Sequence, residues 1–197
     1  MMSRGILMFF GVLATYISAL FGINLIPKFM LERVRPEGTM LPYAYTEQEL
    51  RGRRVYVREG CVYCHSQQIR AKQNGSDMER GWGQRPTVAQ DYVHDSPVLL
   101  GTMRTGPDLA NIGVRQPSDD WHLKHLYNPR ITSPGSIMPP YPWLFMKQGE
   151  YDRGMTLDLP QEFAPEAGAQ VIPTQEALDL VAYLKSLKRN YKVEGLK

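Results

Sequence analysis

The two cysteines of the chain, Cys61 and Cys64, are followed at once by His65. This C-x-x-C-H pattern is typical of covalent haem c attachment. Two thiols on one helical turn can bond to the two vinyl groups of a porphyrin, and the adjacent imidazole can reach the iron from one face. A redox dithiol or half of a zinc site is the alternative, but a zinc site would need a second ligand pair and the sequence has no further cysteine. We therefore predict one covalent haem c, with His65 as an axial iron ligand.

A haem held by one histidine needs either a second axial ligand or an open coordination position. Several methionines lie between the haem motif and the last predicted helix, among them those at positions 78, 103, 138 and 155. Met138 stands in SPGSIMPPYPWL, where several prolines restrict the backbone and so favour a fixed side-chain position. Histidine and methionine together make a six-coordinate haem suited to electron transfer. We predict Met138 as the second ligand, with Met103 as the alternative.

The segment TGPDLANIG, residues 105 to 113, contains a turn at Gly106 and Pro107. Such a turn can bring a backbone carbonyl to the His65 ring nitrogen that does not face the iron. That hydrogen bond would fix the tautomer of the imidazole and raise its basicity. We predict the Pro107 carbonyl as the acceptor; the alternative is an ordinary surface turn.

Two further histidines, His122 and His125, are three positions apart in the segment DDWHLKHLY. This spacing would allow them to share a metal ion, but such pairs more often pack in partly solvated positions. We therefore predict no metal site there. His94 has no evident partner in the sequence.

Helices at both ends of the soluble part are predicted to position the haem motif. Thr46 and Glu49 form a capping box that opens a helix running towards Cys61. After Pro173-Thr174, the segment QEALDLVAYLKSLKRNY has an apolar stripe of helical period. Gly52 would let these two helices cross closely, with Tyr56 and Tyr183 as candidate neighbours. A shorter helix follows Ser118 and stops at Asn128-Pro129.

An uncharged stretch runs from Gly5 to Pro27. It has about the 20 residues that a helix needs to cross the hydrocarbon layer. A cleaved signal peptide would normally have a shorter apolar region that ends in small residues at a cleavage site. The fold class predicted is therefore mainly α. A transmembrane anchor over 5–27 is followed by a linker over 28–45 and a class I cytochrome c-like domain over 46–192. That domain has a Gly-, Pro- and acid-rich insertion at about 146–172.

The orientation of the domain follows from the haem. Covalent haem c is attached outside the cytoplasmic membrane of bacteria, so we expect the soluble domain in the periplasm, anchored to the inner membrane by one span. The basic residues Lys28, Arg33 and Arg35 after the span favour the opposite orientation, but only weakly. The net charge of +3 is small, and the Lys and Arg residues are interspersed with acidic ones, which argues against a nucleic-acid partner. Membrane lipid is then the expected non-protein partner.

Four segments, CVYCHSQQIR, RTGPDLANIG, WHLKHLYNPR and SIMPPYPWL, together with the preceding span, resemble one known family. It is the mono-haem cytochrome c subunit (subunit II, CcoO/FixO-type) of cbb3-type cytochrome c oxidase, a haem-copper oxidase. The resemblance covers most of residues 5 to 145. It weakens over Leu99–Arg104 and is lost over 146–172.

The resemblance implies that Cys61 and Cys64 carry the haem and that His65 and Met138 ligate it. It implies a domain that is not catalytic by itself and that relays electrons to a separate catalytic haem-copper subunit, which reduces dioxygen and pumps protons. Electrons would arrive from a di-haem cytochrome c subunit or a soluble cytochrome c.

Three alternatives remain open from the sequence. The first is the electron-transfer subunit of a related complex that reduces nitric oxide. The second is a haem enzyme such as a peroxidase, which would need an open iron position. The third is a haem-based sensor or assembly scaffold, in which exchange of Met138 would be the signal.

Overall fold

A computed structural model describes residues 3–32, 42–147, 156–165 and 170–193 of the chain. Its contacts divide the chain into two units. The first comprises residues 1–43 and 88–95, and the second comprises residues 44–87 and 96–197. The first unit contains the N-terminal helix, and the second contains the C-x-x-C-H motif.

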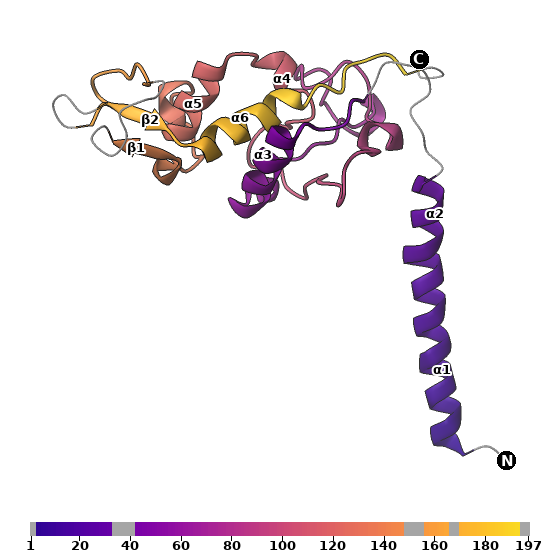
Figure 1. The fold of residues 1–197 in the computed structure, drawn as a ribbon. Coiled ribbons are helices and arrows are strands. Elements are labelled where there is room, and N and C mark those ends of the chain that lie inside the picture. Colours follow the sequence, from indigo (N-terminus) through magenta and orange to yellow (C-terminus); the bar gives the residue numbers. More distant parts are fainter. Residues whose placement is uncertain (1–2, 33–41, 148–155, 166–169, 194–197) are drawn as a thin grey trace. The chain divides into compact units, whose positions relative to one another are not determined.

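The N-terminal unit contains one continuous helix in three parts (Figure 1): α1 (Arg4–Ala19), a π-helical turn (Leu20–Leu25) and α2 (Ile26–Glu32). It begins where the Ser3 hydroxyl accepts a hydrogen bond from the Ile6 N–H at 3.4 Å. The π-helical turn ends two residues before Pro27, whose ring would clash with a regular helical turn and which has no N–H to donate. The helix therefore continues through Pro27 instead of ending there.

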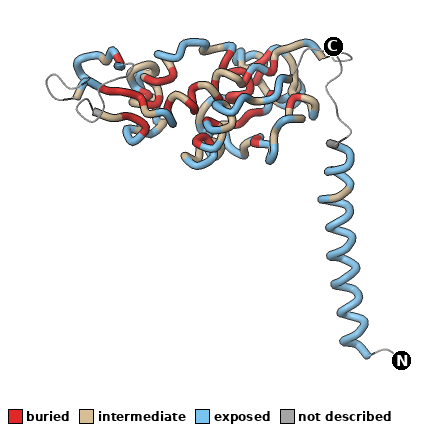
Figure 2. Tube along the Cα trace, in the orientation of Figure 1, coloured by how far each residue is buried: buried red, intermediate tan, exposed pale blue. Residues whose placement is uncertain are grey.

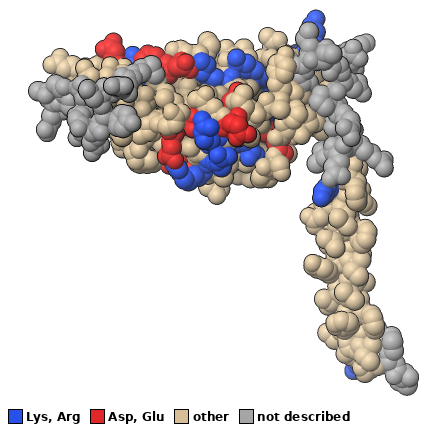
Figure 3. Space-filling model, in the orientation of Figure 1, with Lys and Arg blue, Asp and Glu red and all other residues tan. Residues whose placement is uncertain are grey.

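The segment Arg4–Met30 of this helix is long and apolar enough to cross a membrane. Its surface carries no charge between Arg4 and Lys28 (Figure 3), and its residues are exposed along nearly the whole length (Figure 2). The prediction of one long apolar N-terminal helix is confirmed. Of the predicted linker over 28–45, residues 28–32 are helical and residues 33–41 lie outside the described part of the chain. The same unit includes a short 3₁₀ turn, Ala89–Tyr92.

The second unit is mainly helical. Its helices are α3 (Glu47–Arg58), α4 (Ile112–Arg115), α5 (Asp119–Tyr127) and α6 (Gln175–Ser186). Short 3₁₀ turns occur at Cys61–Tyr63, Lys72–Asn74, Pro129–Ile131 and Pro142–Leu144. The predicted caps are present: Glu49 and Thr46 form a reciprocal capping box at α3, and the Ser118 hydroxyl accepts the Trp121 N–H at 3.2 Å to open α5.

Helices α3 and α6 cross in close contact, as predicted (Figure 1). A Cβ atom at Gly52 would lie 1.8 Å from the carbonyl oxygen of Asp179, so a larger residue would push the helices apart. The rings of Tyr56 and Tyr183 pack edge to face with centroids 5.4 Å apart. The Arg51 guanidinium donates to the buried Asp179 carboxylate at 2.7 Å. This crossing holds the residues before Cys61 against the C-terminal helix.

One small sheet was not predicted. Strand β1 (Phe145–Lys147) pairs antiparallel with β2 (Val171–Pro173), with Met146 opposite Ile172. Leu157 is buried, and its N–H donates to the Val171 carbonyl at 2.9 Å. The described parts of the predicted insertion over 146–172 therefore contribute to the core, while residues 148–155 and 166–169 lie outside the described residues.

Candidate functional site

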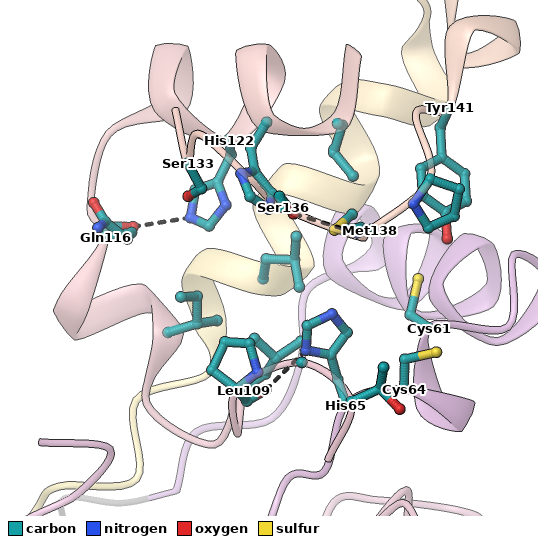
Figure 4. A pocket seen from close by; sticks show the side chains of 18 of the residues that line it. Cys61, Cys64, His65, Leu109, Gln116, His122, Ser133, Ser136, Met138 and Tyr141 are labelled. Carbon is teal, nitrogen blue, oxygen red and sulfur yellow. Dashed lines mark hydrogen bonds between the residues drawn. The ribbon is translucent and has the colours of Figure 1, made fainter. Parts of the chain in front are cut away.

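A cavity of about 600 Å³ opens between the C-x-x-C-H motif, residues 105–116, α5 and the loop 133–141. This volume is within the range of about 300 to 1,000 Å³ that is usual for cofactor and ligand sites. The lining includes every residue predicted to hold haem: Cys61, Cys64, His65, Pro107 and Met138. Figure 4 shows His65 and Met138 on facing walls and the two cysteines at one end. Cys61 and Met138, which are 77 positions apart in the sequence (138 − 61), thus meet around one cavity.

The two thiols reach the cavity because a glycine, Gly60, follows the end of α3. Gly60 has φ +74°, in the left-handed region that glycine adopts without strain, and this turns the chain into the 3₁₀ turn at Cys61. Burial raises the pKa of the Cys61 thiol to about 12. A redox dithiol needs a lowered thiol pKa, so this environment favours the haem interpretation of the motif over the redox one.

The imidazole of His65 is held in one orientation. Its Nδ1–H donates to the Pro107 carbonyl oxygen at 2.8 Å, which leaves Nε2 unprotonated with a free lone pair. The backbone of Gly106 lies directly against the ring, since a Cβ there would be 2.2 Å from His65 Cε1. Burial lowers the pKa of His65, which favours the neutral form that can coordinate a metal.

Met138 lies on a loop whose backbone is fixed at both ends. The loop starts with a turn in which the Ser136 N–H donates to the Ser133 carbonyl at 3.0 Å, with Gly135 at φ +81°. It ends where the Tyr141 N–H donates to the Leu126 carbonyl of α5 at 2.9 Å. The Met138 side chain is partly buried and packs against the core. Its thioether is therefore presented to the cavity by an ordered backbone.

The remaining lining fits a porphyrin. Apolar side chains cover much of the cavity wall: Leu109, Ile112, Leu126, Leu180 and Leu184. The vinyl groups of haem lie on one edge of the ring and its two carboxylates on the opposite edge. Figure 4 places Gln116 and His122 at the end of the cavity away from the cysteines. The neighbouring Arg115 also lines the cavity, and its buried Nε has no hydrogen-bond partner among the described residues. The Nη2 of Arg115 donates to the Asp108 carbonyl, so the Nε–H is the donor that remains available for a haem carboxylate at this edge.

His122 and His125 line the same cavity, which the sequence did not indicate. The His122 Nε2–H donates to the Gln116 carbonyl at 2.9 Å, and the His125 ring stacks on Trp121 with centroids 4.7 Å apart. Burial lowers the pKa of His125 to about 4. Among the residues the structure describes, no group of three or more His, Cys, Asp or Glu side chains could hold a metal ion.

The other candidates from the sequence lie elsewhere. Met103, the alternative ligand, is 58% exposed and does not line the cavity. Met78 is half-buried outside the lining, and Met155 is outside the described residues. His94 belongs to the N-terminal unit, where its Nε2–H donates to the Pro42 carbonyl at 3.1 Å.

Sequence reasoning missed Arg115 and Gln116. The available signal was their position directly after the TGPDLANIG segment, whose turn already contained the predicted partner of His65.

The family model described as "Cytochrome C oxidase, mono-heme subunit/FixO" matches residues 2–157, which is most of the chain. The match includes the N-terminal helix and every cavity residue discussed above up to Tyr141. No curated protein sequence is significantly similar to the chain.

Proposed function

Because the chain belongs to the family of the mono-haem subunit of cytochrome c oxidase, we propose that it is the membrane-anchored electron-transfer subunit of a cbb3-type oxidase. In this role it accepts electrons from a di-haem cytochrome c subunit or a soluble cytochrome c. It passes them to the catalytic haem-copper subunit that reduces dioxygen, and it performs no catalysis by itself. The family match favours dioxygen over nitric oxide as the final electron acceptor.

One observation carries the proposal: two thiols, an imidazole and a thioether converge on one cavity with an apolar lining. Cys61 and Cys64 would attach haem c covalently, and His65 and Met138 would ligate its iron. When bound, haem c supplies a one-electron redox centre. Protein ligands on both walls would leave no open iron position for a substrate, which argues against an enzyme such as a peroxidase.

The chain's own residues prepare this centre for fast electron exchange. The Pro107 carbonyl holds the Nδ1 proton of His65, so Nε2 is the nitrogen left to bind iron. The fixed loop keeps the Met138 sulfur on the opposite wall. Apolar side chains such as Leu109 and Leu184 line the space between them, which disfavours water there. A site whose ligands need not move has a small reorganisation cost when the iron changes oxidation state.

The membrane anchor is the apolar helix of the N-terminal unit. Covalent attachment of haem c outside the bacterial cytoplasmic membrane favours a periplasmic position for the second unit. Figure 3 shows acidic and basic side chains intermixed on the visible face, without the concentrated positive field that nucleic-acid binding requires. The expected partners are therefore oxidase subunits and membrane lipid.

Gentle detergent purification of the complex containing the full chain would test the proposal. We expect co-purification of a large haem-copper subunit, consumption of dioxygen and rapid reoxidation of the haem c of this chain by dioxygen. A complex that turns over while this haem stays reduced would contradict the relay role.

A double variant, Cys61→Ser with Cys64→Ser, tests the attachment separately. In the wild-type chain and in either single variant, acid-acetone should leave haem on the protein, because at least one thioether remains. In the double variant it should extract all of the haem. Covalent haem retained in the double variant would overturn the attachment assignment.

A further inference from the structure

A fully buried carboxylate, Asp108, follows Pro107 in the chain. Its Oδ2 accepts hydrogen bonds from the Ser66 hydroxyl at 2.6 Å and from the Gln68 N–H at 2.7 Å. Its Oδ1 accepts the Ala110 N–H at 2.8 Å. One side chain therefore joins the segment that follows His65 to the segment that follows Pro107.

The backbones of the same two segments are also joined directly. The Gly106 N–H donates to the Cys64 carbonyl at 2.9 Å, and the Leu109 N–H donates to the Ser66 carbonyl at 2.8 Å. The hydrogen bond between His65 and Pro107 lies between these two links. Asp108 joins the two segments on one side of this hydrogen bond. The distance from the Pro107 carbonyl to the imidazole therefore depends on the Asp108 carboxylate.

The directions of the hydrogen bonds indicate an ionised carboxylate. Arg104 Nε–H donates to the Ser66 oxygen at 2.7 Å, so the hydroxyl proton of Ser66 is available for Asp108. Every group that the structure shows bonded to this carboxylate is a donor. Burial raises the pKa of Asp108, and the three donated hydrogen bonds and the charge of Arg104 oppose that shift.

The charge of Asp108 is only partly neutralised. Arg104 lies 3.8 Å from its carboxylate but 2.6 Å from the carboxylate of Asp77, to which Arg70 also donates at 3.2 Å. Arg104 is therefore shared, and its closer partner is Asp77, while the guanidinium of Arg115 donates to the backbone carbonyl of Asp108. Asp108 remains as a negative charge next to the residue that binds the His65 ring.

We propose that Asp108 is a positioning residue for the haem-ligating imidazole. Its carboxylate holds the Pro107 carbonyl against Nδ1 of His65 and, through its charge, favours the oxidised haem, so that it lowers the reduction potential. The proposal rests on the proposed function, because it requires haem ligated by His65.

The test compares Asp108→Asn with Asp77→Asn in the full, haem-loaded chain. Asp77 is a matched control, since it is 1% exposed, binds the same Arg104 and its carboxylate otherwise accepts hydrogen bonds, among the residues the structure describes, from Arg70. Asparagine keeps the shape of the side chain but removes its charge. Both variants should lose stability, but only Asp108→Asn should raise the reduction potential. At a fixed solution potential, its ratio of oxidised to reduced haem should fall at least threefold, which corresponds to a rise of about 30 mV for one electron.

A vibrational measurement separates positioning from charge alone. In a Met138→Ala background, the iron–histidine stretch of the reduced haem reports the strength of the Nδ1 hydrogen bond. Asp108→Asn should move this stretch to lower frequency, and Asp77→Asn should leave it unchanged. If Asp108→Asn does not fold, Ser66→Ala removes one of the three donors and should produce a smaller shift in the same direction.

Equal potentials and equal iron–histidine frequencies in Asp108→Asn and Asp77→Asn would overturn the proposal and leave Asp108 with a purely structural role. An unchanged frequency in Ser66→Ala would do the same where Asp108→Asn does not fold. Failure of the proposed function would look different, because the wild-type chain would then carry no covalent, histidine-ligated haem.

Discussion

The contact between Gly106 and the His65 ring supports a quantitative prediction for Gly106→Ala. The Cβ atom of alanine would lie 2.2 Å from Cε1 of the ring and 2.7 Å from Nδ1. Ordinary contact begins at 3.4 Å, so the ring and the backbone must separate by about 1 Å. The backbone at 106 does not have a positive φ, so the cost of this substitution is steric.

That separation would break the hydrogen bond to Pro107. The Nδ1 to oxygen distance is now 2.8 Å, and a further ~1 Å exceeds hydrogen-bond range. We expect a loss of about 1–3 kcal/mol from overpacking and about 1 kcal/mol from the hydrogen bond. The free energy of unfolding of the haem-loaded domain should fall by about 2–4 kcal/mol. Without this hydrogen bond the imidazole donates less electron density to the iron. The reduction potential should therefore also rise, because ferric iron is stabilised by such donation more than ferrous iron is.

Chemical denaturation followed by haem absorbance measures the first quantity, and a redox titration measures the second. Gly75→Ala is a suitable control, because the three atoms nearest to its Cβ all belong to the flexible guanidinium of Arg70, the nearest at 3.0 Å. If Gly106→Ala matched this control in both measurements, close packing of residue 106 on the imidazole would not be what orients His65.

Three further predictions concern the opposite ligand, the helix crossing and pH. Met138→Ala should give a reduced haem that binds carbon monoxide and has a lower potential, whereas Met103→Ala should leave the absorption spectrum unchanged; the opposite pattern would transfer the ligand role to Met103. Gly52→Ala should lower the free energy of unfolding by at least about 1–3 kcal/mol in denaturation experiments, since α3 must move away from α6, and an unaltered value would contradict the close crossing. Burial raises the pKa of the Asp179 carboxyl, but hydrogen bonds from Arg51 and Gln175 outweigh burial and hold it below its ordinary value. Its contribution to stability is therefore present at neutral pH and lost as pH falls through the lowered pKa, so acid unfolding curves should show a smaller loss in Arg51→Leu than in the wild type.

Much of the candidate site could be predicted because its signals are local. The C-x-x-C-H spacing, the capping box at Thr46 and the apolar run after Arg4 each depend on residues within one or a few turns of the chain. The proline-rich loop around Met138 is local in the same sense, since each proline restricts its own backbone and that of its predecessor.

Other features could not be predicted because they depend on contacts between distant segments. The pairing of β1 with β2 joins strands of three residues each, too short to show a periodic pattern. The three-position spacing of His122 and His125 suggested a metal pair or solvated packing. Only the docking of α5 beside the cavity shows that both rings line it.

The sequence by itself determined the chemistry available to this protein: two thiols and an imidazole at fixed spacing, a methionine in a stiff loop, and an apolar helix ahead of them. The tertiary structure decided which groups meet. It placed Met138 on the cavity wall and Met103 on the surface, and it brought Asp108 against the residues that follow His65. The physical reason is that residue type and spacing specify local conformation, whereas the crossing of α3 and α6 and the buried hydrogen bonds specify the distances between remote segments.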